Sequence, residues 1–140
     1  MPQLFVLFFI WPSLLVNKDA DVVLGVWYNG EKDARIEIYH CGDKYCGKII
    51  WLKEPMEDGA TKKDKHNPDE KLQKRELMGL NILEGFVYTG DKTWEDGTIY
   101  NPRDGKTYSC YLALQDDGEL KVRGFIGFSL IGKTQYWARP

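Results

Sequence analysis

The chain has 140 residues, of which 43% are hydrophobic and 14% aromatic. This length fits one domain with a single core, and the aromatic content argues against a low-complexity or disordered chain. The formal net charge is −2, from 19 Lys and Arg against 21 Asp and Glu that are interspersed along the chain. A broad attraction to phosphate backbones, and with it a nucleic-acid partner, is therefore not expected.

The chain begins with an almost unbroken apolar run from Leu4 to Val16. The run is too short to cross the hydrocarbon core of a membrane, but it has the length of the apolar region of a signal peptide. We expect residues 1–20 to be an export leader, residues 21–140 to form the folded domain, and the protein to be periplasmic or secreted, with no transmembrane span. Two features oppose the leader: residues 1–3 carry no Lys or Arg, and residues 16–20 offer no clean small-x-small cleavage site. A misassigned start codon or a packed N-terminal segment is the alternative.

Apolar and polar residues mostly alternate beyond the leader, which is the pattern of half-buried β-strands. Eight strands are predicted, at residues 23–29, 34–40, 47–52, 80–89, 92–100, 106–114, 119–126 and 133–139. The runs Asn-Pro-Arg-Asp-Gly at 101–105 and Asp-Asp-Gly at 116–118 carry the turn residues of hairpins. Strands joined by short hairpins pair antiparallel, and eight of them can close on themselves without an exposed edge. The predicted fold class is all-β, an eight-stranded antiparallel up-and-down barrel.

One long connection, from Lys53 to about Gly79, interrupts the strands and is rich in charged residues and proline. Within it, Pro68 stands where the first turn of a helix accepts proline, followed by acidic residues at the positive end of the helix dipole. A short helix is predicted from Pro68 to about Arg75. The acidic residues between Glu57 and Glu70 lack the spacing of a calcium loop, so no metal is expected there.

Cys41 and Cys46 are separated by four residues, a spacing that a hairpin loop can bring within disulfide range. In an oxidising compartment they are expected to pair, with a stabilisation of about 2–3 kcal/mol for so short a loop. A zinc site is not expected, because such sites favour two Cys-x-x-Cys pairs or added histidines and the chain has only His40 and His66. Cys110 lies in an alternating run and is expected to be a buried apolar side chain rather than a reactive thiol.

The residues Gly25-x-Trp27 near the start of the domain and Arg139 near its end resemble the signature of lipocalins and calycins. That resemblance implies structural closure of the barrel by Gly25, Trp27 and Arg139, with the indole plugging one end and the guanidinium packed across it. A cation over an indole face contributes about 0.5–2 kcal/mol. A more specific likeness covers the chain from about Gly25 to Arg139 and is carried by the runs IEIYHCGDKYCGKIIWLKEP, DKHNPDEKLQKRELMGLNIL, GTIYNPRDGKTYSCYLAL and LKVRGFIGFSLIGKTQYWAR. These runs are similar to domain of unknown function 2147, a family of small exported bacterial proteins. The resemblance implies a lipocalin-like fold, a leader and two hairpin cysteines, here Cys41 and Cys46, with no established activity.

An eight-stranded barrel leaves room for a packed core or for one small ligand. If Lys48 points outward, alternation places Ile49 and Trp51 inside. Trp51, Tyr100 and Tyr108 are the aromatic residues predicted to line a ligand pocket, because their rings offer area and the Tyr hydroxyls offer orientation. Ordinary core positions are the alternative for all three.

The segment Gly127–Gly132 is unusual for a hairpin loop, because three of its four inner residues are large and apolar. Such a loop can fold over the mouth of the barrel, or it can contact a partner protein, a second copy of the chain or a membrane.

No catalytic constellation is expected. Asp96 and Asp104 stand next to glycine in turn-like contexts, where aspartate is common for conformational reasons. His40 and His66 have no Ser or Cys partner in a recognisable motif. We therefore predict that the protein is not an enzyme and needs no cofactor.

The leading hypothesis is a non-catalytic barrel that binds a small apolar or amphipathic ligand. The alternative is an interaction module with a filled barrel, which docks a protein partner or a second copy through Gly127–Gly132 or through its outer face. An enzyme with an unrecognised site is the third. An interior cavity of about 300 Å³ or more, open at one end, favours the first hypothesis. A filled interior favours the second, and a cavity with two convergent titratable groups the third.

Overall fold

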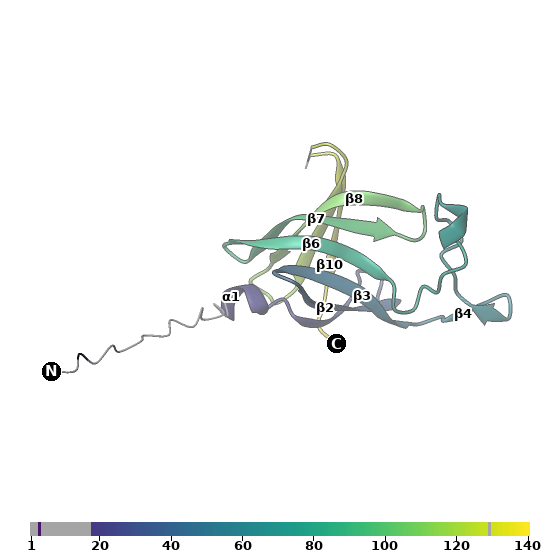
Figure 1. The fold of residues 1–140 in the computed structure, drawn as a ribbon, viewed down its shortest axis with the longest axis horizontal. Coiled ribbons are helices and arrows are strands. Elements are labelled where there is room, and N and C mark those ends of the chain that lie inside the picture. The colour runs from purple at the N-terminus through teal and green to yellow at the C-terminus, as the bar shows by residue number, and fades with distance from the viewer. Residues whose placement is uncertain (1–2, 4–17, 129) are drawn as a thin grey trace.

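The computed structural model describes residues 3, 18–128 and 130–140. Its elements are α1 (Lys18–Asp21), β1 (Gly25–Tyr28), β2 (Ala34–Cys41), β3 (Lys44–Leu52), β4 (Met56–Glu57), β5 (Ala60–Thr61), the 3-10 helix η1 (Glu70–Leu72), β6 (Asn81–Gly90), β7 (Thr93–Asn101), β8 (Lys106–Leu114), β9 (Leu120–Phe125) and β10 (Gly132–Trp137). All strands but β4 and β5 form one antiparallel sheet in the order β1-β2-β3-β6-β7-β8-β9-β10 (Figure 1). The predicted eight-stranded antiparallel fold is confirmed.

The first and last strands of the sheet meet where Tyr28 lies opposite Ala138. The backbone N–H of Tyr28 donates to the Ala138 carbonyl at 2.7 Å, and the N–H of Ala138 donates to the Tyr28 carbonyl at 3.2 Å. The sheet therefore curls round until its two edges touch, and its concave side becomes the interior of a barrel.

Side-chain alternation separates the interior from the outer face. On β2, Ala34, Ile36 and Ile38 are buried, whereas the residues between them are partly exposed. The end of the barrel near α1 is filled by large side chains that are almost fully buried: Trp27, Phe86, Trp94, Leu112 and Leu120.

The short helix α1 covers this filled end (Figure 1). The carbonyl of Ala20 accepts a hydrogen bond from the indole N–H of Trp94 at 3.1 Å. Asp21 accepts one from the Tyr45 hydroxyl at 2.5 Å. Residues 18–20, which the prediction assigned to the leader, are thus part of the described fold. The apolar run expected to be a leader lies outside the described residues, so cleavage there stays a prediction.

The long segment between β3 and β6 is less helical than predicted. In place of a helix from Pro68 to about Arg75, it contains only η1, whose cap is Asp69: the carboxylate of Asp69 accepts from the backbone N–H of Lys71 at 3.0 Å. The β4–β5 hairpin was not predicted, because two-residue strands are too short to show alternation.

A buried carboxylate anchors this segment to the barrel. Asp64 is fully buried and accepts hydrogen bonds from the Tyr100 hydroxyl at 2.5 Å, from Arg75 Nε at 2.8 Å and from Asn67 Nδ2 at 2.9 Å. The turn after β7 also packs tightly against the segment, since a Cβ on Gly105 would lie 1.9 Å from the His66 carbonyl oxygen. These contacts fix the segment at one side of the barrel's open end.

Both predictions for the cysteines are confirmed. Cys41 and Cys46 form a disulfide across the β2–β3 turn, with their Cα atoms 5.8 Å apart. Cys110 is a free thiol inside the barrel, and burial raises its pKa to about 12. A thiol that stays protonated is a poor nucleophile.

Within the described part of the chain, none of the helices has the length and apolar character needed to cross a membrane.

Candidate functional site

A cavity of about 1170 Å³ lies at the end of the barrel away from α1. Its inner wall is apolar and is formed mainly by Ile36, Ile49, Ile82, Ile99, Val122 and Trp137. Its rim is polar and comes from the β1–β2 turn, the β7–β8 turn, the long segment after β3 and the start of β10. Small-molecule sites commonly enclose about 300–1,000 Å³, so the cavity is large enough for a ligand.

The apolar wall follows from the pairing of β7 with β8. Ile99 lies opposite Tyr108, so both side chains project from the same face of the sheet into the cavity. Gly124 on β9 faces the same space: a Cβ added there would lie 3.3 Å from Ile99 Cγ2 and 3.6 Å from Tyr108 Cβ. The missing side chain at this position leaves room in the cavity.

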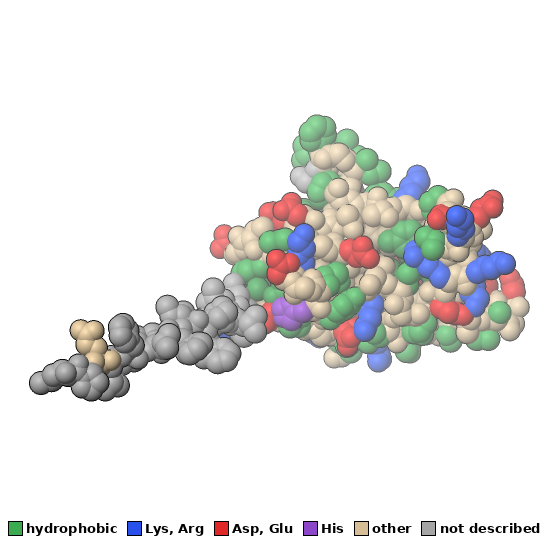
Figure 2. Space-filling view, in the orientation of Figure 1, with side chains coloured by type: hydrophobic (Ala, Val, Ile, Leu, Met, Phe, Trp, Pro, Cys, Tyr) green, Lys and Arg blue, Asp and Glu red, His purple; other side chains and the backbone are tan. Residues whose placement is uncertain are grey.

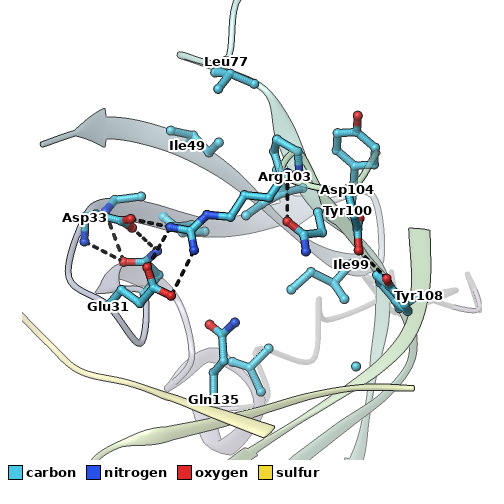
Figure 3. Close-up of a pocket in the computed structure, with 18 of the residues that line it drawn as sticks. Glu31, Asp33, Ile49, Leu77, Ile99, Tyr100, Arg103, Asp104, Tyr108 and Gln135 are labelled. Atoms are coloured by element: carbon cyan, nitrogen blue, oxygen red, sulfur yellow. Dashed lines mark hydrogen bonds and ion pairs between the residues drawn. The ribbon is translucent and has the colours of Figure 1, made fainter. Parts of the chain in front are cut away.

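An ion pair spans the rim (Figure 3). Arg103, in the β7–β8 turn, donates two hydrogen bonds to the Glu31 carboxylate, from Nη1 at 2.9 Å and from Nη2 at 2.7 Å. Its Nη2 also donates to Asp33 at 2.5 Å. Both acceptors belong to the β1–β2 turn, so these contacts connect turns that are distant in the strand order. We call Glu31, Asp33 and Arg103 the rim bridge.

The charges of the rim bridge are paired, but its side chains are exposed to solvent. The hydrogen bond and charge of Arg103 lower the pKa of Glu31, and the same hydrogen bond raises the pKa of Arg103. Both side chains are more than half exposed to solvent. Exposed ion pairs contribute little to stability and are screened by salt. The bridge can therefore open at low cost.

Tyr108 is the predicted aromatic residue that projects into the cavity. Its hydroxyl donates a hydrogen bond to Asp104, on the same side of the rim. This hydrogen bond to a carboxylate raises the pKa of Tyr108. The hydroxyl is thus held in place at the junction of the apolar wall and the polar rim, and ligand contact by Tyr108 stays a prediction.

The predicted inward orientation of Trp51 is wrong. Ile36 pairs with Ile49, but the preceding residue, Arg35, pairs with Trp51, so β3 holds one extra residue at this point. Such a bulge moves the following side chains to the other face. The Trp51 ring accordingly lies on the outer face, edge-on to Tyr28 at 6.0 Å between centroids, with the Arg35 guanidinium 4.8 Å from the ring centre.

A second bulge changes the orientation of Tyr100. Trp94 and Gly97 pair with consecutive inward positions of β8, so an extra residue lies between them, and Asp96 takes the positive φ of 62°. From there on the odd-numbered residues face inward. Tyr100 borders the cavity, but its hydroxyl donates to Asp64 on the outer side. Ligand contact by Tyr100 stays a prediction that this geometry does not favour.

The closed end has the arrangement that the Gly25, Trp27 and Arg139 pattern implies. The Arg139 guanidinium carbon lies 3.8 Å from the centre of the Trp27 ring. Its N–H groups donate to the backbone carbonyls of Val22, Leu24 and Val26. Gly25 has φ +106°, and a Cβ there would lie 3.0 Å from Arg139 Nη1. The position thus has a glycine-type backbone, and a Cβ there would press against the Arg139 guanidinium. How much this contact stabilises the barrel stays a prediction.

No pattern in the sequence indicates the rim bridge. Arg103 and Glu31 are 72 residues apart, and each stands in a turn whose composition is explained by turn geometry alone. No local spacing relates them. A prediction would have needed the strand order, which places the two turns at the same end of the barrel.

The Glu31 carboxyl group at the rim does not have the pKa shift of a general acid. A general acid at neutral pH needs a carboxyl group with a raised pKa, whereas Arg103 lowers the pKa of Glu31. Among the residues that the structure describes, no group of three or more His, Cys, Asp and Glu side chains is arranged to hold a metal ion.

Comparison with known proteins identifies relatives of the fold. The family described as "Uncharacterized protein conserved in bacteria (DUF2147)" matches residues 25–139. The chain is also similar to a solved structure described as "Protein HP1028 from the human pathogen Helicobacter pylori belongs to the lipocalin family", with 28% sequence identity and a TM-score of 0.73 over 84% of this chain and 82% of that one. No curated protein matches the chain. The lipocalin-like fold expected from the sequence resemblance is confirmed.

Proposed function

Because the chain belongs to the DUF2147 family of uncharacterized bacterial proteins, whose description names no activity, we propose its function from the cavity itself. The protein binds a small amphipathic molecule inside the barrel and does not convert it chemically. The lipocalin-like fold supports binding of a small ligand at the level of the family. The class of ligand follows from the lining of the cavity.

The observation that carries the proposal is a cavity of about 1170 Å³ with an apolar wall and a charged rim. The wall favours an apolar body because burying it removes hydrocarbon from water. The rim favours a polar end group, which can stay hydrated or hydrogen-bond to Tyr108 or to the rim bridge. The same cavity argues against the filled barrel that the interaction-module alternative required.

We also propose that the protein acts outside the cytoplasm. The Cys41–Cys46 disulfide supports this, because such bonds persist in oxidising compartments. Thiol alkylation of freshly fractionated cells tests it. Paired cysteines in an exported fraction are expected, and free thiols in a cytoplasmic fraction would refute export.

Ligand binding is tested with a neutral apolar fluorophore, N-phenyl-1-naphthylamine, titrated into the wild-type protein and two variants. Ile99→Glu places a charge on the cavity wall, whereas Thr98→Glu places the same charge on the outer face of the same strand. We expect saturable binding to wild type and to Thr98→Glu, and binding at least about tenfold weaker to Ile99→Glu, because a charge against an apolar ligand is poorly solvated. Unfolding curves verify that both variants are folded.

Two outcomes contradict the proposal: no saturable binding to wild type, or equal binding to Ile99→Glu and Thr98→Glu. Native mass spectrometry of protein purified from its own cells complements the titration. A co-purifying small mass that is absent from Ile99→Glu identifies the ligand.

A further inference from the structure

The turn between β9 and β10 exposes four large apolar side chains. Their exposed fractions are 63% for Ile126, 76% for Phe128, 91% for Leu130 and 65% for Ile131. In Figures 1 and 2 this hairpin projects from the body of the barrel and ends in an apolar cap. We call these four side chains the apolar tip. Ile126 and Ile131 border the cavity, whereas Phe128 and Leu130 are not among its lining residues and point into solvent instead of folding over the barrel mouth.

The backbone of the tip is organised by its own hydrogen bonds. The N–H of Ile126 donates to the carbonyl of Ile131 at 3.1 Å, and the N–H of Ile131 donates to the carbonyl of Phe128 at 3.0 Å. The side chains thus point into solvent from a formed turn. Soluble monomers rarely expose a contiguous apolar group of this kind unless it is an interaction surface.

The apolar tip is continuous with the cavity. Ile126 and Ile131 line the cavity mouth together with the neighbouring residues Phe125 and Gly132. Any surface that covers the tip therefore lies directly beside the opening through which a ligand enters the barrel.

The charge of the hairpin indicates what covers the tip. The hairpin of β9 and β10, residues 120–137, contains Lys121, Arg123 and Lys133 but no Asp or Glu, which gives a formal charge of +3. The whole chain is −2, so the remaining residues together carry −5. Lys133 and Arg123 lie close to the tip, on the two paired strands of the hairpin. An apolar tip on a basic hairpin is complementary to an anionic lipid surface. Two copies of the hairpin, by contrast, would repel each other.

We propose that the apolar tip inserts into an anionic membrane surface and holds the mouth of the barrel against it. Phe128 and Leu130 enter the boundary between headgroups and acyl chains, while Lys133 and Arg123 stay at the level of the lipid phosphates. The cavity then exchanges its ligand directly with the bilayer. This exchange rests on the proposed ligand binding, whereas the docking of the tip does not.

A fluorescent label at the tip tests docking in the full-length chain. Leu130→Cys carries an environment-sensitive dye, which reacts at this site because Cys41 and Cys46 are paired and Cys110 is buried. Asp116→Cys, in the β8–β9 turn at the other end of the hairpin, is the control. With vesicles of phosphatidylcholine and phosphatidylglycerol, we expect a blue shift at position 130 and none at position 116. No shift at 130, or equal shifts at both positions, overturns the proposal, because binding would then be absent or mediated by another part of the chain.

Vesicle sedimentation tests the apolar contribution. Phe128→Ser combined with Leu130→Ser should weaken binding at least about tenfold, because burial of one large apolar side chain is already worth about that factor. Met56→Ser combined with Met78→Ser changes two exposed apolar residues elsewhere and should bind like wild type. Equal loss in both double variants contradicts a specific role for the tip.

The charge contribution is tested by Lys133→Glu against Lys44→Glu, which change the net charge equally at the tip and at the β2–β3 turn. Only Lys133→Glu should weaken binding to anionic vesicles, and raising the salt concentration should reduce that difference. Equal binding of wild type to neutral and anionic vesicles overturns the lipid assignment. So does a wild-type dimer in analytical ultracentrifugation that the Phe128→Ser and Leu130→Ser changes abolish.

The ligand-binding proposal and the membrane-docking proposal can be refuted independently of each other. Phe128→Ser combined with Leu130→Ser should keep wild-type affinity for N-phenyl-1-naphthylamine in solution, because the cavity wall is untouched. Loss of vesicle binding without loss of probe binding locates the defect in docking. Failure of probe binding in a protein that still docks refutes the ligand proposal alone.

Discussion

Substitution of Trp27 by alanine tests the architecture of the closed end. The Trp27 side chain is 1% exposed, its indole N–H donates to the Val23 carbonyl at 2.9 Å, and Arg139 lies across its face at 3.8 Å. Replacing a buried tryptophan with alanine removes its apolar contacts and leaves a cavity, at a cost of about 3–5 kcal/mol. A domain with a total stability of about 5–15 kcal/mol would lose much of it.

A double-mutant cycle separates the cation–π contact from the packing. The variants are Trp27→Ala, Arg139→Met and the two combined, each unfolded with urea under oxidising conditions and followed by near-UV circular dichroism. The coupling free energy should be about 0.5–2 kcal/mol. Trp51→Ala is the matched control, because this tryptophan lies on the outer face and should cost less. Two results would refute this account of the closed end. One is a loss of stability below about 1 kcal/mol for Trp27→Ala, where a buried Trp→Ala substitution costs about 3–5 kcal/mol. The other is a coupling free energy of zero.

Four further predictions concern the rim, the long segment and the disulfide. Arg103→Gln should shift the thermal midpoint by no more than about 3 °C, since exposed ion pairs contribute little, and a loss as large as that of a core substitution contradicts the exposed bridge. Because Arg103 lowers the pKa of Glu31 in the folded state, the stabilisation by the bridge is fully present above the ordinary Glu pKa of 4.5 and is lost as the pH falls through the lowered pKa of Glu31. Stopped-flow release of the probe should therefore accelerate on acidification in wild type but not in Arg103→Gln. Asp64→Ala should cost about 2–3 kcal/mol in urea unfolding, because it leaves several donors of a buried network unpaired. Hydrogen exchange should become faster first in the segment between β3 and β6. An equal increase in exchange over the whole chain would argue against an anchoring role. Cys41→Ser combined with Cys46→Ser should cost about 2 kcal/mol for so short a loop, and a variant as stable as wild type would show that the bond does not constrain the unfolded chain.

The strands could be predicted because alternation and turn chemistry are local signals. Residues 106–114 were predicted to be a strand and form β8 with the same bounds, since a Gly-containing turn precedes them and their inward positions follow every second residue. The disulfide and the buried state of Cys110 followed from equally short-range patterns. The predicted helix was too long. Asp69 caps a single 3-10 turn, and the hydrogen bond from Arg75 to Asp64 then directs the chain away from a helical course.

The faces of two site residues could not be predicted, and the cause is the same for both. Alternation counts residues, so one extra residue in a strand reverses every later assignment. Bulges in β3 and β7 place Trp51 outside and aim the Tyr100 hydroxyl away from the cavity. The β7 bulge includes Asp96 at a positive φ, but an Asp-Gly pair is equally typical of an ordinary turn. The rim bridge is a long-range contact, and no pattern in either turn reveals it.

The division of the barrel into a filled end and an open end follows from where its largest and smallest inward residues lie. The interior of an eight-stranded barrel is only just wide enough for its own side chains. Trp27 and Trp94 occupy the interior near α1, and each indole N–H finds a backbone carbonyl there, so that end is filled without an unpaired polar group. Toward the mouth, Gly124 faces Ile99 and Tyr108 and contributes no side chain. Space for a ligand therefore arises at the end that also carries the polar rim and the apolar tip. A molecule that leaves a membrane along the tip would contact apolar side chains first and charged side chains only at the rim.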